Sequence, residues 1–516
     1  MKPGARILFI VWLSIVFGAG LACGQDEPNR CSPLPTGEAV QEDEDDRGPQ
    51  DASVTEHTLL VGGTTLHYTA TAGYLPIRGR SDRVVADIFY VAYERQDTAS
   101  QGTSRPITFA FNGGPGSSAV WLHMGGLGPR RALLAENGTA LPRSVTLQDN
   151  EYTWLEFTDL VFVDPVGSGF SRPADGDAKQ FYEVQRDAEI ASDFVRSFVT
   201  RHNRWLSSQY IVGESYGTIR AVLMTRYLQD HYGLYIDGLV LLSTALNMGA
   251  ITFDPGNDLP YVLSVPSYAA AARYHRRGGE RMPLDSEKSL DKVKDWALQD
   301  YIAALAKGSS LRETEFRQVA GRLADYAGLP ERLVASSRLR ISNGDFVQEL
   351  LRSQGRTLGL LDSRVTMGNV GSIRHQWIDP AFFLVQGPFV AAFNDYVRVE
   401  LGFKADLTYV FLSEQANQAW NWGEARHGYL NVAPILAEAM NLDNRIRVFN
   451  AAGYYDLATP YASQEYVLDH LGLPAGLLAN ITLRHYPAGH QIYTSTDALR
   501  QLTSDVRAFI THPCVR

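Results

Sequence analysis

Short apolar runs recur along this chain, and each is followed by a glycine-rich turn. They are found in PITFAFNGGPG, DLVFVDPVGSGFS, QYIVGESYG, IDGLVLLSTAL, RIRVFNAAGYYD and NITLRHYPAGH. Runs of about four to six apolar residues without alternation are typical of strands that are buried on both faces, as in a mostly parallel sheet. Helix-like segments, such as residues 184–200 and 219–231, lie between several of these runs. We therefore expect an α/β domain with a mostly parallel central sheet and helices on both faces.

The pattern changes in two other parts of the chain. Residues 57–77 and 83–96 alternate apolar and polar positions, which predicts hairpin strands. Between about residues 249 and 363 the strand pattern disappears, and segments with helical spacing and polar outer faces replace it. We expect residues 249–363 to be a mainly helical cap, inserted between a first core segment at 54–248 and a second at 364–516.

The first 53 residues carry signals of a different kind. A basic start is followed by an apolar run at 7–17 and by small residues before Cys23, which is typical of an export signal and too short to span a bilayer comfortably. We expect residues 1–22 to be a signal peptide and residues 23–53 to be an acidic, disordered tether. Cleavage before Cys23 would suit a bacterial lipoprotein anchored through that thiol. Gly20, however, stands where such a signal has a large aliphatic residue, so simple secretion is the first expectation.

Composition and charge exclude some classes of function. The formal net charge is −10, and no run of Lys and Arg is present that would follow a phosphate backbone, so nucleic-acid binding is disfavoured. No Cys and His spacing predicts a metal site, and we expect neither a metal nor another cofactor. If Cys23 is removed or acylated, Cys31 and Cys514 remain, and export would permit them to form a disulfide.

The stretch GESYG, residues 213–217, joins an apolar run to a helix-like segment. This pattern at such a junction is typical of a nucleophile elbow, in which the serine hydroxyl stands clear of the sheet; the alternative is a serine that merely lies between two glycines. A serine hydroxyl is a weak nucleophile, so it needs a base, a group that orients the base, and donors for the oxyanion. We expect Ser215 to be the nucleophile, with the amides of Tyr216 and of Gly114 in the loop FNGGPGSS as oxyanion donors.

Two later strands end on residues that could complete such a site. In sheets of this type the partners follow in the order Ser, Asp, His, each at the end of a later strand. Asp456 follows VFNAAGYY, and His490 follows LRHYPAG. Asp456 alone could also be a loop or helix-cap carboxylate. Among the competing histidines, His470, His485 and His512, none stands after a glycine at the end of a strand. We expect Ser215, Asp456 and His490 to form a catalytic triad.

Five separated motifs together resemble those of the serine carboxypeptidases, the group of carboxypeptidase Y and cathepsin A. They are FNGGPGSS, LVFVDPVGSGFS, GESYG, the Asp after a strand, and AGH. The resemblance covers about residues 107–242 and returns at about 447–493. It implies an α/β-hydrolase fold and, for an exported bacterial member, a peptidase that removes single residues from peptide C-termini at acidic pH through an acyl-enzyme on Ser215.

The same resemblance implies how the C-terminus of the peptide is recognised. It assigns Asn112, Gly113 and Glu214 to binding of the substrate's terminal carboxylate. One carboxylate can form a hydrogen bond with another only if one of them is protonated. Glu214 must therefore stay neutral, as burial and low pH both favour.

Three positions depart from the family's pattern. Gly126 in GGLGP stands where a second glutamate is common, Ser117 replaces a cysteine, and Gln491 replaces a methionine after the histidine. The missing glutamate is the reason to consider an esterase or acyltransferase on the same fold and triad. A third hypothesis, a binding protein on an inactive hydrolase scaffold, is opposed by the complete set of triad residues.

Overall fold

The structure is a computed structural model of the 516-residue chain. It describes residues 52–79, 81–96, 105–139, 144–278, 287–368, 379–423 and 428–512. The expected signal peptide, nearly all of the expected tether, the thiol of Cys23 and the expected pair of Cys31 with Cys514 lie outside the described residues.

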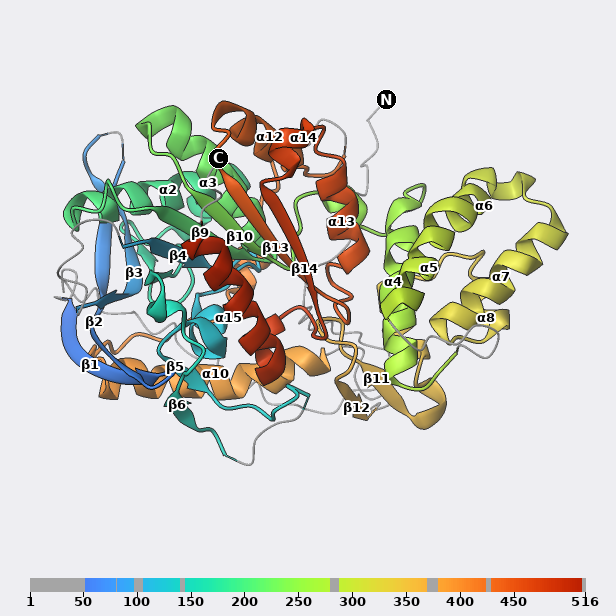
Figure 1. The fold of residues 1–516 in the computed structure, drawn as a ribbon, viewed down its shortest axis with the longest axis horizontal. Helices are drawn as coiled ribbons and strands as arrows, with labels where there is room; N and C mark the ends of the chain where they lie inside the picture. Colours follow the sequence, from blue (N-terminus) through green and yellow to red (C-terminus); the bar gives the residue numbers. More distant parts are fainter. Residues whose placement is uncertain are drawn as a thin grey trace, which may run out of the picture.

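A ten-stranded sheet forms the centre of the described chain (Figure 1). In order across the sheet, the strands are β1 (Ser53–Val61), β2 (Thr64–Arg78), β3 (Val84–Arg95), β7 (Asp159–Val163), β4 (Ile107–Phe111), β9 (Gln209–Glu214), β10 (Gly238–Leu242), β13 (Arg447–Gly453) and β14 (Ile481–Tyr486), and β8 (Arg172–Pro173) pairs with β3. The strands from β1 to β3 pair antiparallel, and so do β3 and β7. From β7 to β14 every pair is parallel, which confirms the mostly parallel sheet.

The central strands are apolar because both of their faces are covered. In β10, Val240 and Leu242 pack into one core cluster, whereas Leu239 and Leu241 pack into the cluster on the other side of the sheet. Side chains alternate between the faces of a strand, so a strand covered on both sides needs apolar residues at successive positions. This is the physical reason for the short continuous apolar runs in the sequence.

Helices cover both faces of the sheet, as expected (Figure 1). One face carries α2 (Val184–Arg201), α3 (Tyr216–Tyr232), α12 (Ala433–Leu442), α13 (Tyr461–Asp469) and α14 (Ala475–Leu478). The other face carries α1 (Val120–Leu122), α10 (Pro380–Val399) and α15 (Thr496–Thr511). The short helix α11 (Glu414–Ala419) lies between α10 and α12 in the chain. In the part of the chain that the structure describes, no helix combines the length and the apolar character needed to span a bilayer.

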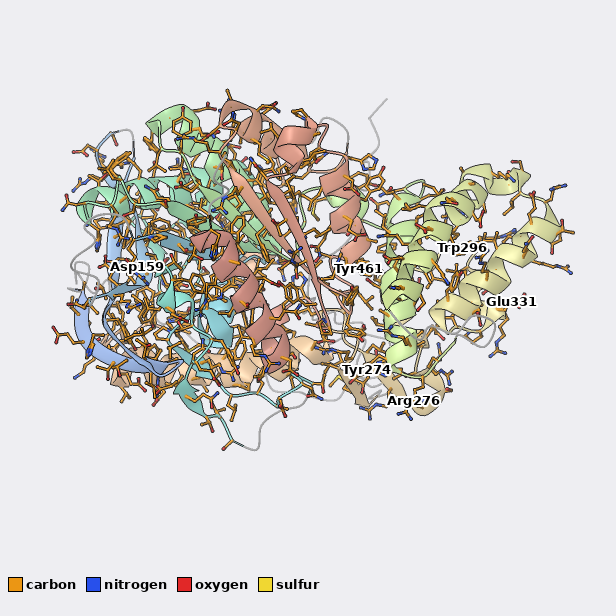
Figure 2. The ribbon with its side chains drawn as sticks, viewed as in Figure 1. Asp159, Tyr274, Arg276, Trp296, Glu331 and Tyr461 are labelled. Carbon is orange, nitrogen blue, oxygen red and sulfur yellow. The ribbon has the colours of Figure 1, made fainter. Side chains whose placement is uncertain are left out.

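A helical lobe follows β10 and stands to one side of the sheet (Figure 1). It consists of α4 (Leu259–Tyr274), α5 (Glu287–Trp296), α6 (Ile302–Lys307), α7 (Glu313–Ala327), α8 (Glu331–Ser336) and α9 (Asn343–Glu349). The lobe has its own apolar core, in which Trp296 stacks on Tyr301. Figure 2 shows Trp296 within the lobe and Tyr461 of α13 beside α4, with which α13 is in contact.

Two details of the lobe differ from the pattern in the sequence. The helical pattern before Gly308 is divided into α5 and α6 by a π-helical turn, Ala297–Tyr301. After the lobe, β11 (Arg356–Leu358) and β12 (Thr366–Gly368) form a two-stranded ribbon, as β5 (Arg130–Ala132) and β6 (Leu147–Asp149) do elsewhere. Such three-residue strands are too short to show an alternation that a sequence pattern could reveal. The domain boundaries given above stay predictions.

Candidate active site

Ser215 lies at the sharp turn between β9 and α3, and its backbone is strained. Its φ of 58° and ψ of −125° are values that residues with a side chain rarely adopt. Such strain persists only where the surroundings hold it, and it is common at functional sites. The turn is tightly packed: a Cβ on Gly213 would lie 2.3 Å from the Gly217 carbonyl oxygen, and a Cβ on Gly217 would lie 2.5 Å from that of Phe111. Both flanking positions therefore require glycine.

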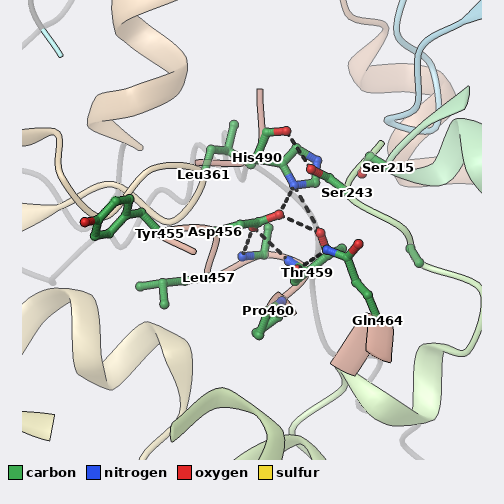
Figure 3. A network of polar contacts seen from close by, with 12 residues as sticks. Ser215, Ser243, Leu361, Tyr455, Asp456, Leu457, Thr459, Pro460, Gln464 and His490 are labelled. Carbon is green, nitrogen blue, oxygen red and sulfur yellow. Dashed lines mark hydrogen bonds and ion pairs between the residues drawn. The ribbon is translucent and has the colours of Figure 1, made fainter. Parts of the chain in front are cut away.

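Asp456 and His490 follow the neighbouring parallel strands β13 and β14, and their side chains are hydrogen-bonded. The distance from His490 Nδ1 to Asp456 Oδ2 is 2.8 Å (Figure 3). The buried carboxylate also accepts hydrogen bonds from the amides of Ala458 and Thr459, at 2.8 and 2.9 Å, and from Thr459 Oγ1 at 2.6 Å. With both oxygens held in this way, Asp456 fixes the orientation of the imidazole.

The structure brings Ser215 and His490 to the wall of one pocket. Figure 3 shows Ser215 on the side of the His490 ring that faces away from Asp456. Within the described residues the Ser215 hydroxyl makes no hydrogen bond to the imidazole. Catalytic hydrogen bonds often form only when the substrate is bound. Burial alone would lower the pKa of His490, but the carboxylates of Asp456, Glu214 and Asp379 together raise this pKa above its ordinary value.

The loop after β4 packs directly against the elbow. A Cβ on Gly113 would lie 2.6 Å from both the Glu214 carbonyl oxygen and the Tyr216 amide nitrogen. Gly114 adopts a φ of 101°, in the region that favours glycine. Among the described residues, neither the Gly114 amide nor the Tyr216 amide has a hydrogen-bond acceptor. Both expected oxyanion donors are thus free to bind an oxygen that enters the pocket.

Glu214 is buried beside Ser215, with 4% of its surface exposed, and lines the pocket. Burial, and to a smaller extent the charge of Asp456, raises its pKa from 4.5 to about 7, although His490, Tyr493 and Asn112 act in the opposite direction. Asn112 is fully buried and does not line the pocket; its Oδ1 accepts a hydrogen bond of 3.1 Å from the Leu122 amide.

The pocket is a cavity of about 480 Å³ between the sheet and the helical lobe. Its wall is mostly apolar, and it includes parts of the lobe, of α10 and of α11. These are contributed by residues such as Asn343, Gln348, Phe382 and Glu414. The volume is in the range of pockets that bind small molecules or short peptide segments.

Of the three positions that depart from the family's pattern, two lie at this pocket and the third lies in the buried core. Ser117 and Gln491 line it. Gly126 belongs to a buried π-helical turn, His123–Leu127, and a Cβ there would lie 2.7 Å from Leu499 Cδ1. Position 126 therefore has no room for a longer side chain without repacking.

The sequence pattern did not reveal the segment that returns from the helical lobe, residues 359–365. The His490 amide donates to the Leu361 carbonyl at 2.6 Å, the Leu457 amide donates to the Leu360 carbonyl at 3.0 Å, and Asp379 accepts from the Leu361 amide at 3.0 Å. These are backbone contacts between distant parts of the chain, and no local motif encodes them. Among the described residues no cluster of His, Cys, Asp and Glu could hold a metal ion.

Comparison with known proteins places the chain among relatives of one kind. The family model of the serine carboxypeptidases matches residues 62–233. The serine carboxypeptidase-like protein 45 of Arabidopsis thaliana is 27% identical over 203 residues, which are 37% of this chain and 40% of that relative. The pheromone-processing carboxypeptidase of Phytophthora infestans is 30% identical over 145 residues, 28% of this chain and 22% of that relative. The matched part of the chain thus spans less than half the length of these curated relatives.

A solved structure with a similar outline is the proline iminopeptidase of Mycobacterium smegmatis, with a TM-score of 0.35 and 12% identity over 88% of this chain and 97% of that chain. The matched residues 62–233 contain the loop after β4, the segment after β7 and the elbow. A mostly parallel sheet covered on both faces, with Ser, Asp and His at the ends of successive strands, has the organisation of an α/β hydrolase. Over residues 62–233 the chain is similar to the serine carboxypeptidases.

Proposed function

We propose that this protein is an exported serine carboxypeptidase that hydrolyses the C-terminal peptide bond of its substrate through an acyl-enzyme on Ser215. The observation that carries the proposal is the buried carboxyl group of Glu214, next to Ser215 in the pocket, with a pKa of about 7. In its protonated form this group donates a hydrogen bond to a carboxylate, so it favours a peptide end over an internal segment.

The proposed chemistry uses the groups around the elbow in sequence. The Ser215 hydroxyl attacks the scissile carbonyl while His490 accepts its proton, and Asp456 stabilises the imidazolium through the 2.8 Å hydrogen bond. The amides of Gly114 and Tyr216 stabilise the oxyanion. His490 then protonates the departing amino acid. Water, deprotonated by His490, hydrolyses the acyl-enzyme and restores the hydroxyl.

Recognition of the terminal carboxylate is proposed to come from Asn112, Gly113 and Glu214. Asn112 Nδ2 and Glu214 Oε2 are buried and have no hydrogen-bond partner within the described residues. Buried polar atoms normally have partners, because leaving them unpaired is costly. A ligand carboxylate in the pocket, which has several acceptor sites, would accept a hydrogen bond from the protonated carboxyl group of Glu214 at the pocket wall. Above the pKa of Glu214, two negative charges would repel one another and weaken binding.

The direct test is release of free amino acid from an N-blocked dipeptide. We expect faster release at pH 5 than at pH 8, and loss of the activity in Ser215→Ala. Ser192→Ala is the matched control, because this buried serine donates only to the Ala188 carbonyl within α2. Covalent labelling by a fluorophosphonate should require Ser215, and absence of labelling in folded protein would instead favour an inactive binding scaffold.

An esterase or acyltransferase on the same triad is the second candidate. It is favoured by Gly126, because no acid stands there and the adjacent space is filled by Leu499. Hydrolysis of simple esters without release of amino acid from blocked dipeptides at either pH would support this candidate and contradict the carboxypeptidase. Transfer of the acyl group to an added alcohol would identify the acyltransferase.

Export and the lipid anchor are proposals from the first residues alone. Expression with the natural leader, followed by N-terminal sequencing and mass spectrometry of the mature chain, tests both. A free N-terminus downstream of residue 22 supports secretion, whereas an acylated Cys23 supports the anchor.

A further inference from the structure

The space beside Gly126 is occupied by a side chain from another part of the chain. A Cβ on Gly125 would lie 2.3 Å from Cδ2 and Cε2 of Tyr493, and a Cβ on Gly126 would lie 3.2 Å from Cβ of the same residue. Tyr493 stands three positions after His490 in the sequence, and 1% of its surface is exposed. Its ring thus packs against the turn in which the family commonly has a second glutamate.

The Tyr493 hydroxyl interacts with the carboxyl group of Glu214. The hydroxyl acts to lower the pKa of Glu214. In turn, the pKa of Tyr493 is raised well above its ordinary value, first by burial and then by the charge of Glu214. Asn112 interacts with both groups. The Tyr493 hydroxyl, Asn112 Nδ2 and Glu214 Oε2 are nevertheless each without a hydrogen-bond partner among the described residues. The three groups therefore form a cluster whose distances or angles lie outside hydrogen-bond geometry.

The two carboxyl oxygens of Glu214 differ in how they lie relative to the pocket and to Tyr493. Glu214 lines the pocket, whereas Oε2 is buried with the Tyr493 hydroxyl. Tyr493 and Asn112 do not line the pocket. Oε2 is the fully buried oxygen, which leaves Oε1 as the oxygen nearer the pocket. A Tyr493 hydroxyl that comes within hydrogen-bond geometry of Oε2 when a ligand binds would favour the Glu214 proton on Oε1.

We propose that Tyr493 takes the place of the acid absent at Gly126, as a positioning residue that holds Glu214 with its proton directed at the substrate's terminal carboxylate. The inference rests on the proposed carboxypeptidase function and deepens it. Binding of the substrate carboxylate would tighten the cluster into full hydrogen bonds. Specificity for a free C-terminus would then need one acid and one phenol, where the family commonly uses two acids.

The test compares Tyr493→Phe with the wild-type protein on two substrates. One is an N-blocked dipeptide with a free carboxylate, and the other is the same blocked amino acid as an ester without a carboxylate. We expect KM for the dipeptide to rise on the order of tenfold, because Glu214 is no longer held in position and its hydrogen bond to the charged ligand is weakened, with kcat nearly unchanged. Kinetic constants for the ester should stay within about twofold of wild type.

The pH profile supplies a readout that a merely structural role would not move. KM for the dipeptide should rise as Glu214 loses its proton, and the midpoint should shift to higher pH in Tyr493→Phe, because a hydroxyl that lowers the pKa of Glu214 is gone. His490, Asp456 and Asn112, the other groups that influence Glu214, are unchanged in the variant. In Glu214→Gln, adding Tyr493→Phe should leave KM unchanged.

Tyr486→Phe is the matched control. Tyr486 is also fully buried and near His490 in sequence, but its hydroxyl donates to Asp505 at 2.8 Å. This control should change neither KM nor the midpoint. The proposal is overturned if Tyr493→Phe affects both substrates equally, or if the midpoint does not move. Wild-type protein that cleaves the ester but no dipeptide would instead refute the carboxypeptidase function. Removing an unpaired hydroxyl should not unfold the protein, and circular dichroism at pH 5 verifies this.

Discussion

Replacing Glu214 by glutamine should change how the stability of the protein depends on pH. The carboxyl group of Glu214 is buried, and its pKa is raised from 4.5 to about 7 in the folded protein. Between these values the folded state binds a proton that the unfolded state has released. The proton bound by Glu214 therefore stabilises the folded state. This contribution to the free energy of unfolding is fully present below pH 4.5 and is lost as the pH rises through about 7. Glutamine cannot titrate, so Glu214→Gln lacks this contribution.

The size of the effect follows from the interval between the two pKa values. Each pKa unit corresponds to about 1.4 kcal/mol, so the interval from 4.5 to about 7 corresponds to about 3 kcal/mol. Relative to Glu214→Gln, the wild-type protein should lose about this much free energy of unfolding from pH 4 to pH 8. His490 adds to the effect with the same sign. Glu214 raises its pKa, so its contribution also declines as pH rises and is smaller in the variant.

Denaturant unfolding of both proteins at half-unit steps from pH 4 to pH 8 measures the difference. Glu465→Gln is a control of opposite sign. Burial would raise the pKa of Glu465, but Lys294 at 2.9 Å and His485 at 3.0 Å lower it below its ordinary value. Its stabilisation is present above the unfolded pKa and is lost as the pH falls. The free energy of unfolding of the wild type minus that of Glu214→Gln should fall as the pH rises. If this difference stays constant or increases with pH, a buried, protonated Glu214 is refuted.

Three further predictions concern two tightly packed glycines and one buried ion pair. Gly113→Ala should lower kcat on the order of 10²-fold, because its methyl group would lie 2.6 Å from the Tyr216 amide nitrogen; a retained kcat in steady-state assays would show that this contact is not critical. Gly126→Glu should destabilise the protein by about 1–3 kcal/mol through overpacking against Leu499, and thermal unfolding without a drop in Tm would contradict this. Arg364→Met should cost about 3 kcal/mol because it leaves the buried carboxylate of Asp362 unpaired, and denaturant unfolding should show that adding Asp362→Asn recovers most of the loss.

The parts of the fold that the sequence predicted are those encoded by local patterns. The strand before Ser215 is a continuous apolar run, and the glycines on either side of the elbow are required by contacts of the turn itself. The strands before Asp456 and His490 could be found in the same way, and the order of strands in the sheet then brought their ends together.

The parts that could not be predicted depend on contacts between distant segments. Nothing near Tyr493 in the sequence indicates that its ring packs against Gly125, because the two residues come from opposite ends of the core. The ribbon of β11 and β12 consists of three-residue strands, which carry too few positions to form a pattern. The π-helical turn between α5 and α6 likewise has no distinct apolar period of its own.

The backbone hydrogen bonds of residues 359–365 have a consequence for engineering. The Leu360 and Leu361 carbonyls hold the loops of Asp456 and His490, and in the chain they follow the helical lobe and β11. The lobe is therefore not a freely exchangeable module. A chimera that grafts another cap should keep residues 359–365 with the host core and place its junction before them. A junction placed after this segment would replace both the pocket residues of the lobe and the carbonyl groups that hold the loops of Asp456 and His490. A change in substrate scope would then also change turnover.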